Sequence, residues 1–312
     1  MARVGIVVEA QEGLTWERWR RVVADCERLE FASLRVSDHL QSVIPSRSRS
    51  RPALPAWSAL HLAAEWTEHI ELATIVSPVT FYEPGVLLRQ AEAVDQLSGG
   101  RVVLGLGAGR IAAEHERFEI PFGDWTYRFD RLKHTIQVMQ RLWNEIPGAR
   151  PLPLLLGGTG ARRAVPLIAR YAQEWNGFML DEVAYRDAVA AIDTACAAIG
   201  RDSGSIRHSL STLFLIGRSR RDLRERAMQL MNLLGGAPLL NRPGWEVAQR
   251  GPDEFIDFAK RHWPAVGTPE EAAERLRPLI DAGVELFLFE HFLHLDGEGL
   301  ELLATEVMPK LL

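Results

Sequence analysis

The sequence predicts an α/β fold, and more specifically a single (β/α)8 TIM barrel. Short apolar and β-branched runs alternate with longer amphipathic stretches along the 312 residues, which is the pattern of successive strand–helix units. Eight strand candidates occur, and no linker rich in Pro, Gly or Ser divides the chain. Eight strands separated by helices favour a closed barrel over an open sheet, so we expect one domain over residues 1–312.

The first four expected strands are rich in Val, Ile and Leu, and they cover residues 4–8, 33–37, 70–76 and 101–107. Each strand precedes a segment whose apolar residues recur with helical spacing. These helices are expected at 15–29, with Thr15 as the N-cap, and at 57–67, 84–96 and 126–144.

The second half of the chain repeats this pattern. Further strands are expected at 153–158, 174–179, 209–216 and 285–290. The intervening helices are expected at 161–172, 182–199, 219 to about 260, and 269–282, and a terminal helix closes the chain.

Composition narrows the class of protein. The net charge of −5 and the sequence pI near 6.0 argue against a nucleic-acid partner, because nucleic-acid-binding surfaces are normally basic. Cys26 and Cys196 lie among apolar neighbours and fit a reduced interior better than a disulfide or a metal site. We see no signal-peptide pattern and no apolar run near the ~20 residues that span a bilayer, so we expect a cytoplasmic protein without membrane contact.

The segment "LSGGRVVLGLGAG" (97–109) admits three interpretations. A transport-ATPase signature would need a partner Gly-x-x-x-x-Gly-Lys-Ser/Thr motif, which the chain lacks. A dinucleotide-binding turn would need the motif Gly-x-Gly-x-x-Gly, but after Gly105 and Gly107 the position of the third glycine is occupied by Arg110, and Ile111 follows. The third interpretation is a helix-ending turn at 98–100, a buried strand, and small residues at its C-terminal end. There, Gly107, Ala108 and Gly109 would let backbone N–H groups approach an anion.

The longer stretch "SPVTFYEPGVLLRQAEAVDQLSGGRVVLGLGAG" (77–109) resembles the luciferase-like monooxygenase family, particularly its members that use the deazaflavin coenzyme F420. Four more passages match the same family: "SDHL" (37–40), "GGTGARRAVPLIARYAQEWN" (157–176), "VGTPEEAAERL" (266–276) and "ELLATEVMPKLL" (301–312). The resemblance implies a bacterial-luciferase-like barrel, coenzyme F420 with FMN as the alternative, and a homodimer. The implied activity is hydride transfer between the deazaflavin and a small organic substrate.

The resemblance also implies roles for residues at the strand ends. Asp38 and His39 would lie beside the deazaflavin ring, and His39 would transfer a proton, a role that suits imidazole because its pKa lies near neutrality. Without the resemblance, the same pair could be a helix-capping Asp and a hydrogen-bonded loop His.

The family places a non-prolyl cis peptide behind the flavin, and by alignment this bond joins Ile75 and Val76. An ordinary strand end stopped by Pro78 is the alternative.

A second glycine-rich turn follows the fifth expected strand. Its residues are Gly157, Gly158, Thr159 and Gly160, and we expect them to open a helix that contains Arg162 and Arg163. A helix N-terminus with flanking glycines is a ready anion site, and the resemblance makes this one the phosphate site of the cofactor. A tight turn without a ligand is the alternative.

Other polar and aromatic residues are candidates with weaker support. Glu9, at the end of the first strand, and Gln11 could line the mouth of the barrel and face the substrate, or they could equally be polar loop residues. Trp125 could also face the substrate. His291 and His294 lack the carboxylate or Cys pattern of a metal site, and Glu114-His115-Glu116 lacks the His-Glu-x-x-His spacing, so no metal is assigned.

Two features depart from the family pattern. Arg110 stands where members usually carry an aromatic or acidic residue. In addition, only residues 145–150 join Asn144 to Pro151, whereas most members have a long segment there that covers the substrate pocket. The sequence therefore predicts an F420-dependent oxidoreductase. An FMN-dependent monooxygenase and a non-catalytic flavin-binding or subunit-type homologue remain the alternatives.

Overall fold

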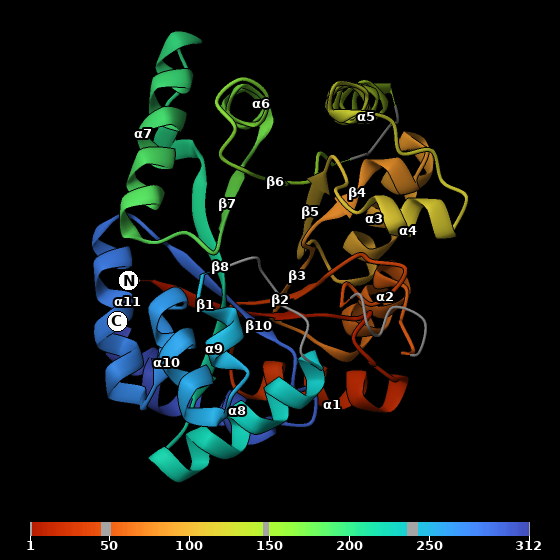
Figure 1. Ribbon diagram of the computed structural model, residues 1–312. Coiled ribbons are helices and arrows are strands. Elements are labelled where there is room, and N and C mark those ends of the chain that lie inside the picture. The colour runs from red at the N-terminus through yellow and green to blue at the C-terminus, as the bar shows by residue number, and fades with distance from the viewer. Residues whose placement is uncertain (1, 45–50, 146–149, 236–242, 312) are drawn as a thin grey trace.

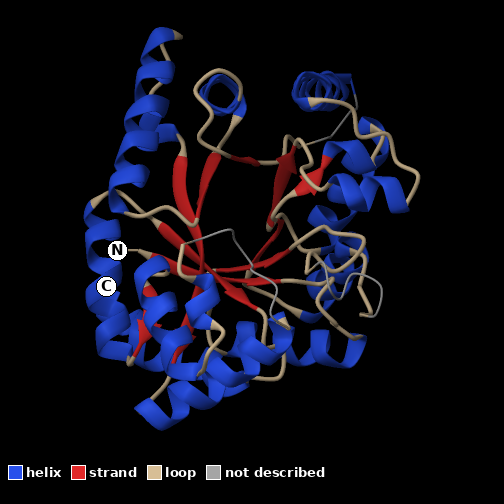
Figure 2. Cartoon of the chain, in the orientation of Figure 1, coloured by secondary structure: helices blue, strands red, loops and turns tan. Residues whose placement is uncertain are grey.

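The computed structural model describes residues 2–44, 51–145, 150–235 and 243–311. Parallel strands form its centre and helices surround them (Figures 1 and 2). The strands follow the order β10-β1-β2-β3-β5-β6-β7-β8, and β8 pairs with β10 to close the ring. The predicted eight-stranded barrel is therefore confirmed.

The barrel strands lie close to the predicted positions. They are β1 (Arg3–Val8), β2 (Ser33–Val36), β3 (Glu71–Thr74), β5 (Val102–Gly107), β6 (Leu154–Gly157), β7 (Glu174–Phe178), β8 (Arg207–Ile216) and β10 (Leu286–His291). Two short strands were not predicted: β4 (Ser77–Pro78), which pairs with β5, and β9 (Ala265–Gly267), which pairs with β8. The expected strand 70–76 is divided, because β3 ends at Thr74, before the Ile75–Val76 peptide, and pairing resumes at β4.

The main helices are α1 (Trp16–Arg28), α2 (Ala56–Trp66), α3 (Pro84–Leu97), α5 (Trp125–Glu145), α6 (Ala164–Tyr171), α7 (Glu182–Ala198), α8 (Arg220–Leu234), α10 (Pro252–His262) and α11 (Pro269–Asp281). Shorter helices are α4 (Ala112–Arg117), α9 (Trp245–Ala248), α12 (Gly297–Leu302) and α13 (Met308–Leu311). Two 3₁₀ turns, η2 (Val79–Phe81) and η3 (Ser203–Ser205), and a π-helical turn, η4 (Leu303–Val307), complete the described elements.

Local signals located several helix ends correctly. The Thr15 side chain accepts a hydrogen bond from the backbone N–H of Arg18, which confirms the predicted N-cap of α1. Gly99 and Gly100 follow α3 with φ of 69° and 95°, the left-handed conformation that ends a helix at low cost when no Cβ is present.

Two expected helices differ from prediction. The helical stretch from 219 to about 260 is divided into α8, α9 and α10, and residues 236–242 lie outside the described part of the chain. The helix expected at 161–172 begins at Ala164, because residues 161–163 form a turn. Arg162 and Arg163 therefore precede α6 instead of lying inside it.

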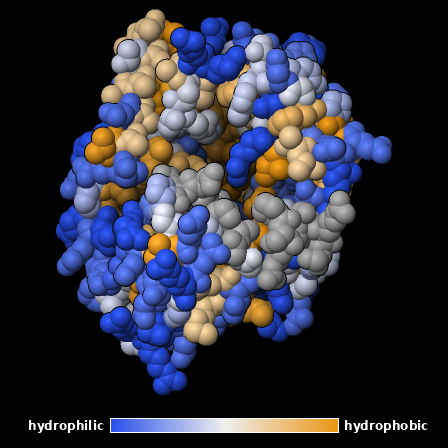
Figure 3. Space-filling view, in the orientation of Figure 1, coloured by the Kyte–Doolittle hydropathy of each residue, from blue (hydrophilic) through white to orange (hydrophobic). Residues whose placement is uncertain are grey.

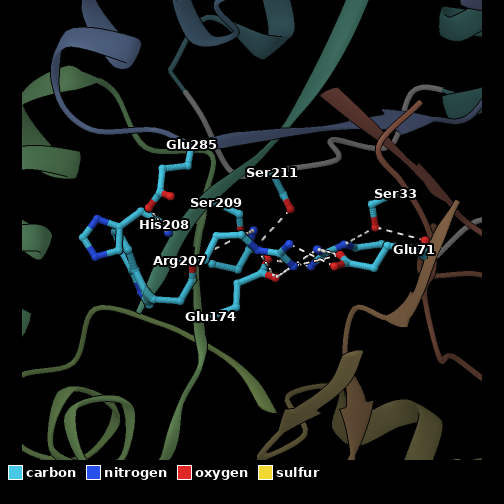
Figure 4. Close-up of polar contacts among 11 residues, drawn as sticks. Ser33, Glu71, Glu174, Arg207, His208, Ser209, Ser211 and Glu285 are labelled. Atoms are coloured by element: carbon cyan, nitrogen blue, oxygen red, sulfur yellow. Dashed lines mark hydrogen bonds and ion pairs between the residues drawn. The ribbon is translucent and has the colours of Figure 1, made fainter. Parts of the chain in front are cut away.

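An ion-pair network fills the end of the barrel where the strands begin (Figure 4). The fully buried Arg35 guanidinium donates to both carboxylate oxygens of Glu174, at 2.7 and 3.0 Å, and contacts Glu71 at 3.1 Å. Arg207 contacts the same two carboxylates from β8. Burial raises the pKa of Glu174, but the two guanidinium groups outweigh it and lower that pKa to about 2. Each buried charge thus has partners, which its desolvation requires.

Candidate active site

A cavity of about 390 Å³ opens at the end of the barrel where the strands finish. Figure 3 shows that the molecule is hollowed on the face seen in Figure 1. Ten of the residues expected at the site line this cavity: Glu9, His39, Ile75, Val76, Gly107, Ala108, Gly109, Trp125, Gly157 and Gly158. The strand ends of a closed barrel converge, so residues far apart in the sequence meet here.

Asp38 does not line the cavity, contrary to expectation, but lies buried outside its lining. Its carboxylate accepts hydrogen bonds from the hydroxyl of Ser77, at 2.6 Å, and from that of Tyr82, at 2.9 Å. Burial is the main cause that raises the pKa of Asp38, and these hydrogen bonds oppose it. Since Ser77 belongs to β4, Asp38 joins the end of β2 to the segment that follows the Ile75–Val76 bond.

His39 lines the cavity and pairs with an acidic residue. Its Nδ1 atom lies 3.0 Å from Oε2 of Glu114, whose carboxylate also accepts the backbone N–H of Leu40. Burial lowers the pKa of His39, but the hydrogen bond and charge of Glu114, together with the charge of Glu9, raise it overall. Because Nδ1 is engaged by Glu114, Nε2 is the ring nitrogen left for a ligand.

Glu114 was missed as a site residue. It lies on α4, a helix that was not predicted, and its neighbourhood had been considered only as a metal motif. Its neighbour His115 is a packing residue: Nε2 lies 2.7 Å from the Thr80 hydroxyl, and Nδ1 lies 2.8 Å from the carbonyl of Ile111. The sequence signal that could have identified Glu114 was its position shortly after a strand end. No sequence pattern, however, connects it with His39, which lies 75 positions away.

Two carboxyl groups face the same cavity from neighbouring strands. Val7 pairs with Glu290 in the β1–β10 register, and Glu9 lies two residues beyond Val7, so both glutamates project to the barrel interior. Burial raises the pKa of each, and the charge of Glu9 raises that of Glu290 further. Glu290 was also missed, because it belongs to a run of apolar residues.

Gln11 does not line the cavity, contrary to expectation. It is fully buried and supports two residues that do line the cavity: its amide donates to Glu9, and its Oε1 accepts a hydrogen bond from the Ser37 hydroxyl at 2.6 Å.

Arg110 lines the cavity, where its positive charge acts to lower the pKa of both His39 and Glu290. The departure from the family pattern therefore places a positive group at the cavity mouth.

Gly107, the last residue of β5, and Gly109, shortly after it, allow close packing against the segment that follows β3. The Ile75–Val76 peptide bond is cis, as expected. A Cβ at Gly107 would come within 2.4 Å of the Val76 side chain, and one at Gly109 within 2.8 Å of the Thr80 hydroxyl. Gly109 also has φ of 78°. A larger residue at either position would displace this wall of the cavity.

The turn after β6 differs from expectation. Gly157 and Gly158 line the cavity, whereas Thr159, Gly160 and Arg162 lie outside its lining. The carbonyl of Gly160 accepts the backbone N–H groups of residues 163, 164 and 165, so the turn leads into α6 without opening it directly. Between described residues, no hydrogen bond uses the backbone N–H of Thr159, Gly160 or Ala161. These donors remain available to an anion.

A line of polar side chains joins the cavity to the ion-pair network below it. Ser211 and Asn176 line the cavity, and the Ser211 hydroxyl donates to Asn176 at 3.1 Å. The Asn176 amide donates to the Ser209 hydroxyl at 3.0 Å, which in turn donates to Glu174 at 2.6 Å (Figure 4). Polar residues alternating within the strand expected at 209–216 were the sequence signal for these contacts.

His291 and His294 are buried, and burial lowers their pKa values to about 4 and 3. Both rings are therefore neutral at neutral pH. Within the described ranges, no group of three His, Cys, Asp or Glu side chains is arranged to hold a metal ion. Nor is any described helix both long and apolar enough to cross a bilayer.

The fold and the cavity define an α/β barrel with a ligand site at the C-terminal ends of its strands. The model of the family described as luciferase-like monooxygenase matches residues 2–286. The chain belongs to the luciferase-like monooxygenase family.

Named relatives agree along most of the chain. The F420-dependent glucose-6-phosphate dehydrogenase of Intrasporangium calvum is 30% identical over 326 aligned positions, covering 91% of this chain and 92% of that one. The F420-dependent hydroxymycolic acid dehydrogenase of Mycobacterium tuberculosis is 27% identical, covering 99% and 88%. The fold also resembles that of an F420-dependent secondary alcohol dehydrogenase solved with an F420–acetone adduct, with a TM-score of 0.78, 16% identity and full coverage of both chains.

Proposed function

We propose that this protein is an F420-dependent oxidoreductase that transfers hydride between the deazaflavin and a small organic substrate. The observation that carries the proposal is the His39–Glu114 pair at a cavity walled by the cis peptide and the glycines at the end of β5. The similarity to two F420-dependent dehydrogenases supports the choice of F420. The deazaflavin would supply the hydride chemistry, while the protein orients the reactants and controls protons and water.

The residues present fit such a cofactor. Ile75, Val76 and the Gly107–Gly109 segment form an apolar and glycine wall suited to a flat ring, and a Cβ at Gly107 would disturb that wall. Gly157 and Gly158 would lie along the ribityl and phosphate part. The N–H groups of Thr159, Gly160 and Ala161 would donate to the phosphate, whose charge needs such donors when it leaves bulk water.

His39 is the proposed acid–base residue. Glu114 orients the ring and accepts a hydrogen bond from Nδ1–H, so Nε2 can take a proton from a substrate hydroxyl during oxidation, or return one during reduction. Asp38 is better assigned as a positioning residue, since its carboxylate accepts hydrogen bonds from Ser77 and Tyr82 and does not line the cavity. This replaces the catalytic role that the resemblance implied for it.

Glu9, Glu290, Arg110 and Trp125 form the proposed substrate side. The raised pKa values of the two glutamates favour a state in which one carboxyl group keeps its proton and donates a hydrogen bond. The cavity can therefore offer both a neutral acid and the Arg110 cation to an oxygen-bearing substrate. Residues 146–149 of the shortened segment lie outside the described residues.

Three further expectations belong to the proposal: one domain over residues 1–312, a homodimer, and a cytoplasmic location. The two free and buried cysteines, Cys26 and Cys196, support the last of these, since neither is placed in a disulfide. Sedimentation velocity tests the dimer, and cell fractionation tests the location.

Titration of the purified protein with F420 and with FMN, followed by fluorescence, tests the proposed cofactor. We expect micromolar or tighter binding of F420 and weaker binding of FMN. Tenfold tighter binding of FMN would favour an FMN-dependent monooxygenase. Binding of neither cofactor would favour the non-catalytic alternative.

A further inference from the structure

Arg110 brings an unpaired positive charge to the cavity. It follows β5, its side chain is exposed, and it is the only Lys or Arg among the described residues that line the cavity. Within the described part of the chain it forms neither an ion pair nor a hydrogen bond, whereas Arg51 pairs with Glu12 and Arg131 with Glu83. The Arg110 guanidinium is therefore left for a ligand.

The acidic residue across the cavity does not cancel this charge. Glu290 lines the cavity from β10, but no ion pair joins it to Arg110. Burial raises the pKa of Glu290 well above its ordinary value, and the charge of Glu9 raises it further, against the opposing effect of Arg110. A carboxyl group that keeps its proton in this way does not repel an anion that approaches Arg110.

Arg110 also lies near the proposed acid–base residue. Its charge acts, together with burial, to lower the pKa of His39, so the guanidinium and the imidazole share one region of the cavity. Nε2 of His39 is the nitrogen left for a ligand, because Nδ1 contacts Glu114. One small ligand can therefore place an anionic group at Arg110 and a hydroxyl at His39.

The side of the cavity away from the proposed ring position is apolar. β8 and β10 lie across the closed ring of strands from β3 and β5, whose ends hold the cis peptide and the glycine wall (Figure 1). Leu213 of β8 and Phe292, which follows β10, are buried and line this far side. Such a lining favours a ligand with a hydrocarbon portion.

Filling the cavity makes a partner for Arg110 necessary. A cofactor ring and a substrate displace water, and a guanidinium that loses water without gaining an anion costs free energy. A carboxylate matches the planar fork of the guanidinium and can accept two hydrogen bonds from it. The ligand itself is the partner that the described residues do not supply.

We propose that the substrate is a hydroxy acid, or the corresponding oxo acid, whose carboxylate pairs with Arg110. The inference rests on the proposed function and names its substrate class. During oxidation the substrate hydroxyl gives its proton to Nε2 of His39, and the hydrogen on the same carbon leaves as hydride to the deazaflavin. The carbon–oxygen single bond becomes a carbonyl, so the product is the oxo acid. The carboxylate keeps all its bonds and serves only to hold the substrate.

Compounds that differ only in the charge of one group test this inference. The value of kcat/KM with F420 is measured for α- and β-hydroxyhexanoate, for the two uncharged hydroxyhexanamides, and for a secondary alcohol of similar length. We expect at least one acid to exceed its amide by about 10–100-fold, the range that a hydrogen bond to a charged group commonly gives. Calorimetric titration with α- and β-oxohexanoate, with and without F420, measures the same contact without turnover.

The variant Arg110→Gln should abolish the preference for the acid over the amide, and Arg110→Lys should restore part of it, because lysine keeps the charge but not the fork. The acid-to-amide ratio is the readout, since Arg110 also acts on the pKa of His39 and its loss changes absolute rates. Arg141→Gln is the matched control: Arg141 is an exposed arginine of α5 that pairs with Glu145 outside the cavity, so this variant should behave as the parent. Circular dichroism checks that all three variants fold.

Two outcomes would overturn the substrate class and leave the proposed function standing. One is parent enzyme that oxidises the amides or the secondary alcohol as well as the acids. The other is F420 binding without turnover of any of these compounds and without binding of either oxo acid. A preference for the acid that persists in Arg110→Gln would reject Arg110 as its anchor.

Failure of the proposed function gives a different result. A parent protein that does not bind F420 would contradict that function, and titration of the cofactor-free protein would then decide the carboxylate site by itself. Binding of an oxo acid that Arg110→Gln abolishes would support the site, and absence of binding would overturn it.

Discussion

The Nδ1 atom of His39 lies 3.0 Å from Oε2 of Glu114, although 75 positions separate the two residues in the sequence. His39 follows β2 and Glu114 lies on α4, after β5, so only closure of the barrel brings them together. Because this contact occupies Nδ1, Nε2 is the ring nitrogen left to face the cavity. The proposed chemistry therefore depends on His39.

Replacing His39 with Ala should slow turnover with F420 by about 10²–10⁴-fold, the range typical of a lost acid–base group. Cofactor affinity should change by no more than a few-fold, since the ring is only one part of the cavity wall. Steady-state rates and fluorescence titration measure the two effects. Unchanged turnover would make His39 a structural loop residue.

Replacing Glu114 with Gln should shift the pH dependence of substrate oxidation. Glu114 raises the pKa of His39, so its removal lowers that pKa. A base must be neutral to act, so the rate rises with pH through the pKa of His39, and this limb should move to lower pH in Glu114→Gln.

The pH–rate profile of kcat, together with the NMR titration of His39, measures this shift. Glu116→Gln is the matched control, because Glu116 is an exposed carboxylate on the same helix and should leave both curves unchanged. A limb that stays in place in Glu114→Gln would contradict the assignment of His39 as the base.

Replacing Gly158 with Asp should weaken F420 binding at least tenfold, about 1.4 kcal/mol. Gly158 has φ of 102°, and an added Cβ would lie 3.3 Å from that of Ala164, so strain accompanies the repulsion of the phosphate. Gly158→Ala, which brings the same strain without the charge, is the control. Fluorescence titration compares the two, and parental affinity in Gly158→Asp would place the phosphate elsewhere.

Replacing Glu174 with Gln should destabilise the fold by about 3–5 kcal/mol, because the buried Arg35 guanidinium would lose the more buried of its two charged partners and keep only Glu71. Urea unfolding measures the change in free energy. Glu182→Gln removes an exposed ion pair with Arg186 and should change stability by less than about 1 kcal/mol. Similar effects of the two substitutions would mean that the interior network contributes little to stability.

The local features of this protein could be predicted from its sequence. Strand and helix order follows from the spacing of apolar residues, which depends on neighbours only a few positions apart. The Thr15 cap and the turn at Gly99 and Gly100 are equally local, since side-chain oxygens and backbone conformation decide them. The family resemblance added the cis bond between Ile75 and Val76.

The contacts that give the site its chemistry were decided by the tertiary structure. His39 with Glu114, Glu9 with Glu290, and Arg35 with Glu174 join residues from different strands or helices. Such partners depend on which strands become neighbours when the barrel closes, and on the burial that shifts their pKa values. The spacing of residues along the sequence indicates neither which strands become neighbours nor how deeply a side chain is buried. The sequence therefore predicted a cavity at the strand ends but not the charges that face one another inside it.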